Sequence, residues 1–204
     1  PIAVESGAHL TLTLAGENTL TTASHGVSAA DAIRVPEGAR LTVKGEGKLT
    51  AETQGGACIG VSTGKSGTIR IEGGVIEATN RDGAAIGGGY SAVAGPIYIC
   101  GGQVTAHGYG NTAAIGGGGL NKAGAELIEI SGGTVYAQAH GVASTAIGAG
   151  ASGPFGTIRI TGGQVTAVAG YGNAMGSGMY RETDTAEGKI ELLGGTLITK
   201  GTVG

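Results

Sequence analysis

The sequence is poor in large rings, proline and cysteine, and each shortage limits the kind of protein it encodes. Of its 204 residues one is Phe, six are Tyr and none is Trp, so bulky rings do not fill its interior. Although 45 residues are Gly, only four are Pro and no Gly-X-Y period occurs, which excludes a collagen-like chain. Hydrophobic residues reach 40%, largely Ile, Val, Leu and Ala, and supply an aliphatic core instead.

Charge and long apolar runs are also scarce. The net charge is −3, from 12 basic and 15 acidic residues, and no basic patch stands out, so nucleic acid is not expected as a partner. No run of 18 apolar residues occurs, so neither a membrane-spanning helix nor a membrane partner is expected. Cys58 and Cys100 lack the spacing of a metal site, and we expect two free thiols and no cofactor.

The main feature of the sequence is a repeat of about 30 residues. An Ala-Ile-Gly motif and its looser copies occur five times, and their central residues, 27 to 32 positions apart, are Ile59, Ile86, Ile115, Ile147 and Met175. Each copy is followed by an Ile-x-Ile motif with a Gly pair, and then by a Val-x-Ala motif. We name these motifs a, b and c. Degenerate versions open the chain and bring the total to about seven units.

Each motif alternates with period two, which is typical of a short strand. Three strands per unit without an intervening helix predict stacked coils. We therefore expect an all-β fold, a single-domain right-handed parallel β-helix (solenoid) of about seven coils over residues 1–204. The predicted inward ladders are Leu12, Leu41, Ile69, Ile97, Ile128, Ile158 and Ile190 on b, and Leu20, Leu49, Ile76, Val104, Val135, Val165 and Leu197 on c.

Neither end of the predicted solenoid shows a capping helix. Open strand edges are normally covered, so we expect the module to be excised from a larger multidomain protein, whose neighbouring domain or loop covers the ends. A second copy, as a homodimer through the uncapped ends, is the alternative.

The outward rows of b and c are mixed in character. Charges on b predict ion pairs of Arg159 with Glu129 and Glu191, and a solvated ladder is favoured over a ligand face with Tyr98 and the arginines. On c, a row of Thr is interrupted by Glu77 and Tyr136, which argues against ice binding. The expected outward rows are Thr13, Thr42, Arg70, Tyr98, Glu129, Arg159 and Glu191 on b, and Thr21, Thr50, Glu77, Thr105, Tyr136, Thr166 and Ile198 on c.

The tyrosines gather beside the a motifs. A Tyr-Gly-Asn sequence occurs twice in the loop from c to a, two coils or about 9.6 Å apart, and two further Tyr lie in the loop from a to b. Tyr rings stack on pyranose faces and Asn binds hydroxyls, so we expect a flat floor of small a residues with aromatic walls. The alternative, that Tyr merely tolerates exposed loops, stays open. The candidate carbohydrate-binding residues are Tyr90, Tyr109, Asn111, Tyr171, Asn173 and Tyr180.

Metal and catalytic sites are not expected. His107 and His140 are predicted at matching loop positions on adjacent coils, each as Ala-His-Gly, but no acidic third ligand is near, which favours ordinary loop histidines. Glycoside hydrolysis needs paired carboxylates, whereas Asp31, Asp82 and Asp184 fall in separate coils. Arg81 and Asp82 are the best acid–base pair, and Asp82-Gly83 is equally a simple turn.

The a, b and c motifs together resemble repeats of secreted and surface proteins of gut bacteria. Within that group the whole chain is similar to non-catalytic parallel β-helix carbohydrate-binding modules attached to plant-polysaccharide enzymes, including xylan-binding ones. The resemblance implies a secreted or cell-surface module that binds a β-linked plant glycan, most of all xylan, and targets an attached catalytic domain. A surface adhesin or structural spacer is the alternative, and a pectate-lyase-like enzyme is the second.

Overall fold

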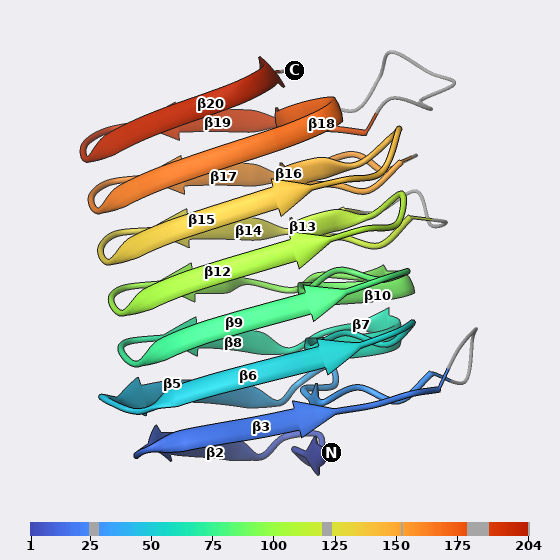
Figure 1. Cartoon of the computed structure of the whole chain (residues 1–204), viewed down its shortest axis with the longest axis vertical. Helices are drawn as coiled ribbons and strands as arrows, with labels where there is room; N and C mark the ends of the chain where they lie inside the picture. The colour runs from blue at the N-terminus through green and yellow to red at the C-terminus, as the bar shows by residue number, and fades with distance from the viewer. Residues whose placement is uncertain (25–28, 120–123, 152, 179–187, 204) are drawn as a thin grey trace.

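The computed structural model describes residues 1–24, 29–119, 124–151, 153–178 and 188–203. These residues form twenty β-strands and no helix, and every pair of neighbouring strands is parallel. None of the described residues forms a helix long and apolar enough to cross a membrane. Successive coils stack along one axis from the N-terminus to the C-terminus (Figure 1), so the expected right-handed parallel β-helix is confirmed.

The b motifs form one face of the solenoid, a parallel sheet of seven strands that we call the b sheet. In chain order its strands are β2 (His9–Leu14), β5 (Arg40–Gly45), β8 (Thr68–Ile71), β11 (Ile97–Ile99), β14 (Leu127–Ile130), β17 (Thr157–Ile160) and β19 (Lys189–Leu192). This count agrees with the expected number of about seven coils.

The c and a motifs form the other two sides. The c strands are β3 (Glu17–Thr21), β6 (Lys48–Thr53), β9 (Val75–Asn80), β12 (Gln103–Gly108), β15 (Thr134–Ala139), β18 (Gln164–Gly176) and β20 (Thr196–Val203). The a strands are β1 (Ile2–Ala3), β4 (Ile33–Arg34), β7 (Ile59–Lys65), β10 (Ile86–Val93), β13 (Ala113–Gly116) and β16 (Thr145–Gly148). Because β18 continues from c into a, both rows belong to one sheet of 13 strands.

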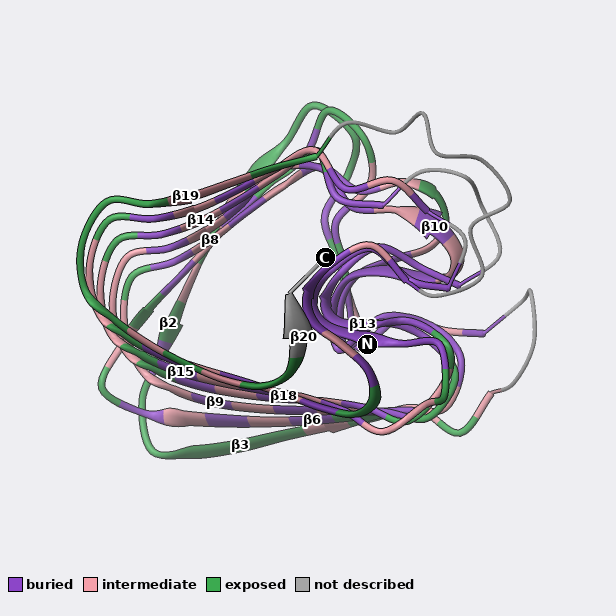
Figure 2. Ribbon diagram, turned by 90° about the horizontal axis from the view of Figure 1, so that it is seen from above, coloured by how far each residue is buried: buried purple, intermediate pink, exposed green. Residues whose placement is uncertain are grey.

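Stacked aliphatic side chains fill the interior. Ile69, Ile97 and Ile128 pair in register on adjacent b strands and are fully buried, as the alternation predicts. The c ladder through Ile76, Val104 and Val135 is equally buried. Seen along the axis, the purple interior lies between the b sheet and the c strands and continues into the a strands (Figure 2). A narrow core of this kind needs no aromatic residues.

The first coil pairs two residues away from the predicted register. Leu41 pairs with Leu10 rather than Leu12, and Leu49 pairs with Asn18 rather than Leu20. The same shift places Thr11 and Thr19, not Thr13 and Thr21, beside Thr42 and Thr50. A shift of two keeps every side chain on its own side of the strand, so the alternating pattern does not distinguish the two registers.

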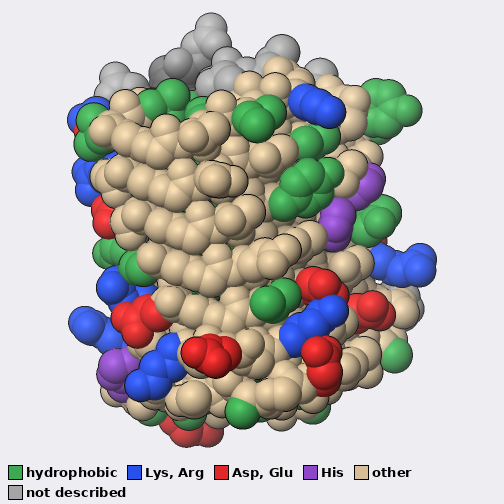
Figure 3. All heavy atoms as spheres, turned by 60° about the vertical axis from the view of Figure 1, so that its left-hand side comes forward, with side chains coloured by type: hydrophobic (Ala, Val, Ile, Leu, Met, Phe, Trp, Pro, Cys, Tyr) green, Lys and Arg blue, Asp and Glu red, His purple; other side chains and the backbone are tan. Residues whose placement is uncertain are grey.

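The outward face of the b sheet carries the ion pairs that the sequence predicts. Arg159 lies 3.1 Å from Glu129 and 2.6 Å from Glu191, so these predicted pairs are confirmed. On the face shown in Figure 3, charged side chains gather over the lower, N-terminal coils, whereas few lie over the coils above them.

Both cysteines are free thiols, as predicted. Burial raises the pKa of the Cys58 thiol to about 12, so this thiol is unreactive at neutral pH.

Candidate functional site

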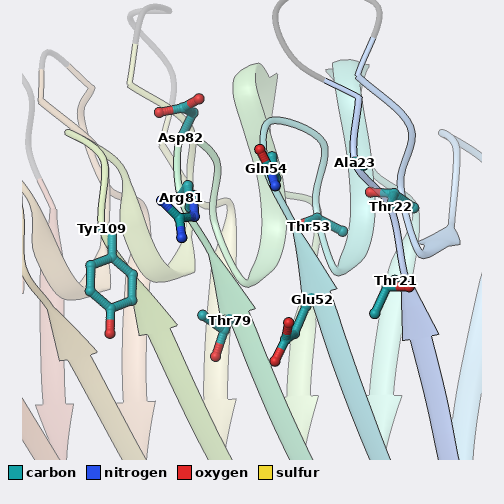
Figure 4. A pocket seen from close by; sticks show the side chains of 10 residues that line it. All are labelled: Thr21, Thr22, Ala23, Glu52, Thr53, Gln54, Thr79, Arg81, Asp82 and Tyr109. Atoms are coloured by element: carbon teal, nitrogen blue, oxygen red, sulfur yellow. The ribbon is translucent and has the colours of Figure 1, made fainter.

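A groove of about 830 Å³ runs along the edge where the c strands end and the loops to the a strands begin. Figure 4 shows its lining side chains side by side on successive coils. We call this edge the c-to-a edge. The groove is lined by Thr21, Thr22, Ala23, Glu52, Thr53, Gln54, Thr79, Arg81, Asp82 and Tyr109.

The floor of the groove comes from the last outward position of successive c strands. Thr21 pairs with Glu52, and Glu52 pairs with Thr79. The next residue in this row, on β12, is His107. Stacking therefore places one polar side chain on each coil, about 4.8 Å from the next.

A buried asparagine shapes the turn that carries the charged wall. Asn80 Oδ1 accepts hydrogen bonds from the backbone N–H groups of Asp82, at 3.0 Å, and Gly83, at 2.8 Å. Its Nδ2 donates to the Ala84 carbonyl at 3.1 Å and to the Gly56 carbonyl on the coil before. Because these bonds fix the backbone as an Asx turn, the side chains of Arg81 and Asp82 remain on the exposed side.

The charged groups of the groove are not neutralised by neighbours. None of the ion pairs found among the described residues involves Glu52, Arg81 or Asp82. Glu52, Arg81 and Asp82 are all exposed. They are therefore available to a molecule that enters the groove.

An aromatic cluster adjoins the groove. The rings of Tyr109 and His140 are stacked, 4.2 Å apart at an interplanar angle of 3°. The ring of His107 lies 5.7 Å from that of His140 and 5.9 Å from that of Tyr136. Burial, and secondarily the charge of His140, lower the pKa of His107.

The two histidines do not occupy matching positions, contrary to the sequence-based expectation. His107 pairs with Gln138 on β15, whereas His140 lies two residues further along and donates its backbone N–H to Gly108 O at 2.8 Å. The rings meet diagonally across adjacent coils because both side chains point outward and stand two residues apart in register.

The predicted tyrosines are divided between two places. Tyr109 is 51% exposed and lines the groove, and Tyr171 is 74% exposed in the part of β18 that follows the c segment. Tyr90 is half-buried within β10, after the a motif, and is not among the groove-lining residues. Tyr180 lies outside the described residues.

The two predicted asparagines both have structural contacts. Asn111 is exposed and its Oδ1 accepts a hydrogen bond of 3.4 Å from the Ala143 N–H. Asn173 Nδ2 donates to the Ser177 carbonyl at 2.7 Å and closes a turn after the a segment of β18. Their role in sugar recognition stays a prediction.

The expected flat floor of a strands is wrong. Ala84, Ala85 and Ile86 are all fully buried, because the chain folds back after this a motif and covers it. Ala84 N–H donates to Gly88 O at 3.0 Å, and Ala113 N–H donates in the same way to Gly117 O at 3.0 Å. The a residues are small because backbone packs against them, so the exposed floor of the site is the row of c-strand ends.

Two residues of the groove floor, Glu52 and Thr79, were missed from the sequence. Their signal was the correct register of the first three c strands, which places them in one outward row. Arg81 and Asp82 stood out as an acid–base pair in the sequence, but only the stacking shows that they face the same groove as Tyr109.

Comparison with known proteins supports the repeat architecture. Residues 69–90, 97–119 and 158–179 match the family model described as Beta helix repeat. The three matches begin within or at the first residue of β8, β11 and β17, and each continues through the next c and a segments, so each spans about one coil. Neither the search of curated proteins nor that of solved structures found a match. The chain has a parallel β-helix fold, and three of its coils match this repeat.

Proposed function

We propose that this β-helix-repeat protein is a non-catalytic carbohydrate-binding module whose glycan lies in the groove along the c-to-a edge. The observation that carries the proposal is one continuous groove with an exposed Tyr109 ring and polar side chains that no neighbouring charge neutralises. The site thus keeps Tyr109 from the predicted set and adds the floor residues.

Sugar chemistry suits this lining. The apolar face of a pyranose ring stacks on an aromatic ring, and sugar hydroxyls both donate and accept hydrogen bonds. Thr79 and Gln54 offer both kinds of group, Glu52 and Asp82 accept, and Arg81 donates. From Thr21 to Tyr109 the groove crosses four coils, a span of about 14 Å, which suits a short stretch of a linear glycan along the solenoid axis.

The finer identity of the ligand is part of the same proposal. The repeat motifs resemble those of plant-polysaccharide-binding modules, which supports a β-linked plant glycan, first of all xylan. The same resemblance supports a secreted or cell-surface location and an attached glycoside hydrolase that the module targets. Tyr171, further along the c-to-a edge, would then contact an extended chain beyond the groove. An adhesin or structural spacer is the alternative function.

One observation favours a second candidate, a polysaccharide-degrading enzyme. Glu52 and Asp82 line one groove together with Arg81, and paired carboxylates are what glycoside hydrolysis requires. The sequence alone had placed its aspartates in separate coils. The stacking places a glutamate from one coil and an aspartate from the next in the lining of the same groove.

Affinity electrophoresis in gels containing xylan, pectin or glucan separates these functions. A binding module is retarded by at least one polysaccharide and releases neither reducing sugar nor unsaturated product from it. Release of product by the isolated chain would establish the enzyme. Normal migration in every gel, without product, would leave the spacer or adhesin function.

A further inference from the structure

We propose that His107 and His140 form a two-histidine site for a divalent transition-metal ion such as Cu²⁺, Ni²⁺ or Zn²⁺. The Nε2 atom of His140 lies 3.5 Å from the Nδ1 atom of His107, on adjacent coils. This site adjoins the glycan groove, but neither histidine is among the groove-lining residues. The proposal therefore does not depend on the proposed carbohydrate binding.

The distance between the two nitrogen atoms suits shared coordination better than a hydrogen bond. An N–H donor and its acceptor normally lie about 2.7–3.2 Å apart, so 3.5 Å is long. Two imidazole ligands, each about 2.0–2.1 Å from a tetrahedral ion, stand about 3.4 Å from one another. The measured separation of the His140 Nε2 and His107 Nδ1 atoms is therefore close to the one that two ligands of a single ion require.

Neighbouring rings and strands hold the two imidazoles in place. His140 is stacked on Tyr109, and His107 lies beside the Tyr136 ring. The parallel pairing of β12 with β15 fixes the backbone of His107, and the N–H of His140, directly after β15, donates to Gly108 O at 2.8 Å. A site whose ligands are positioned before the ion arrives loses little conformational entropy on binding.

The donor set determines which ions suit the site. Imidazole favours Zn²⁺, Cu²⁺ and Ni²⁺, whereas Ca²⁺ and Mg²⁺ prefer oxygen ligands. Among the described residues, no three or more His, Cys, Asp or Glu side chains lie close enough together to hold one ion, so the proposed site has two protein ligands from this part of the chain. Both histidines are half-buried and reach solvent, so water completes the coordination shell.

A histidine binds metal as the neutral imidazole, and binding competes with protons, so the titrations below are made at slightly alkaline pH.

Isothermal titration of the protein without a histidine tag tests the site, with CuCl₂, NiCl₂ and ZnCl₂ as ligands and MgCl₂ as the comparison. We expect one transition-metal ion per chain at pH 7.5, Cu²⁺ as the tightest, and no binding of Mg²⁺. His107→Ala and His140→Ala should each weaken binding at least tenfold. His9→Ala is the matched control, because His9 lies on β2 and its ring contacts Thr42 instead.

The Cu²⁺ electron paramagnetic resonance spectrum of the unmodified chain gives a second readout that needs no variant. Coupling to two imidazole nitrogen atoms is expected. Absence of transition-metal binding, or binding that survives in both His107→Ala and His140→Ala, would overturn the proposal. If a variant fails to fold by circular dichroism, the number of coupled nitrogen atoms in the unmodified protein decides alone.

Discussion

The b sheet and the c-to-a edge use the same stacking of coils but treat charge in opposite ways. On the b sheet, Arg159 bridges Glu129 and Glu191 on the coils either side of it, so successive charges neutralise one another. Along the groove, Arg81, Asp82 and Glu52 take part in none of the ion pairs of the described chain. On the b sheet the side-chain charges are paired with one another. In the groove the charged side chains beside the exposed Tyr109 ring have no ion-pair partner among the described residues and are available to a ligand.

The carboxylates of the b sheet also differ from a buried carboxylate in a third region, the segment just before β4. Hydrogen bonds from Lys189 and Arg159 lower the pKa of Glu191 on the b sheet. Asp31, beneath the a-strand side, is 5% exposed and accepts a 2.8 Å hydrogen bond from Ala57 N–H, yet burial raises its pKa to about 6. The contributions of Glu191 and Asp31 to folding stability therefore change with pH in opposite directions.

The largest effect is expected where the coil folds back behind the c-to-a edge. Gly116 has φ of +136°, and a Cβ there would overlap the Gly148 carbonyl of the next coil. Gly116→Ala should cost more than about 4 kcal/mol of unfolding free energy or prevent folding, because the clash is with backbone. Gly64→Ala is the control: its φ is +79° and nothing lies within 4 Å, so about 1 kcal/mol of backbone strain is expected. Equal losses of unfolding free energy in the two variants, measured by denaturant unfolding, would show that the backbone around Gly116 is not tightly packed.

The next effect is the pH dependence that Asp31 imparts. Its raised pKa means that the folded state binds the proton more tightly, so the contribution to stability is fully present below about pH 3.8 and is lost as the pH rises through 6. The shift corresponds to about 3 kcal/mol between a pH well below 3.8 and pH 7.

Asp31→Asn should remove this slope from the unfolding free energy. Asp82→Asn, at an exposed position, should leave it in place. An unchanged slope in the Asp31 variant would show that its carboxylate is solvated.

The smallest effect on stability is expected on the b sheet. Arg159→Met removes two partly exposed ion pairs, which contribute little to folding and are screened by salt. We expect a small decrease in Tm at low salt that disappears at high salt, and no change in glycan binding. Because the pKa of Glu191 is lowered, its stabilisation is present at neutral pH and is lost on acidification, opposite to Asp31. Loss of polysaccharide retardation in this variant would make the b sheet a ligand face.

Alternation and spacing predicted much of the fold from the sequence. The ladder through Ile69, Ile97 and Ile128, and the Arg159 ion pairs, follow from the recurrence of the b motif in each central coil. The register of the first coil did not follow, because Leu and Thr alternate from residue 10 to residue 14 and two registers bury the same side.

The site was less predictable because it depends on how the chain folds back. The small residues of the a motifs indicated an open floor, whereas hydrogen bonds such as Ala84 N–H to Gly88 O cover them. The contact between His107 and His140 likewise depends on register. His107 pairs with Gln138, so His140 stands two residues further along its coil, although both histidines occur in the same Ala-His-Gly sequence. Tyr109 was predicted because the Tyr-Gly-Asn sequence recurs in the loop from c to a, and the structure places this residue in the groove lining.

Affinity electrophoresis of tyrosine variants tests most directly whether the c-to-a edge binds glycan. Tyr109→Ala and Tyr171→Ala should each weaken binding by about 1 kcal/mol, and together they should nearly abolish retardation, while Tyr98→Ala on the b sheet migrates as the unmodified chain. Tm should be unchanged in all three, because these rings lie outside the buried ladders. If the double variant is still retarded while Tyr98→Ala or Tyr136→Ala is not, the glycan binds on the b sheet or the c face and the assignment to the c-to-a edge is wrong.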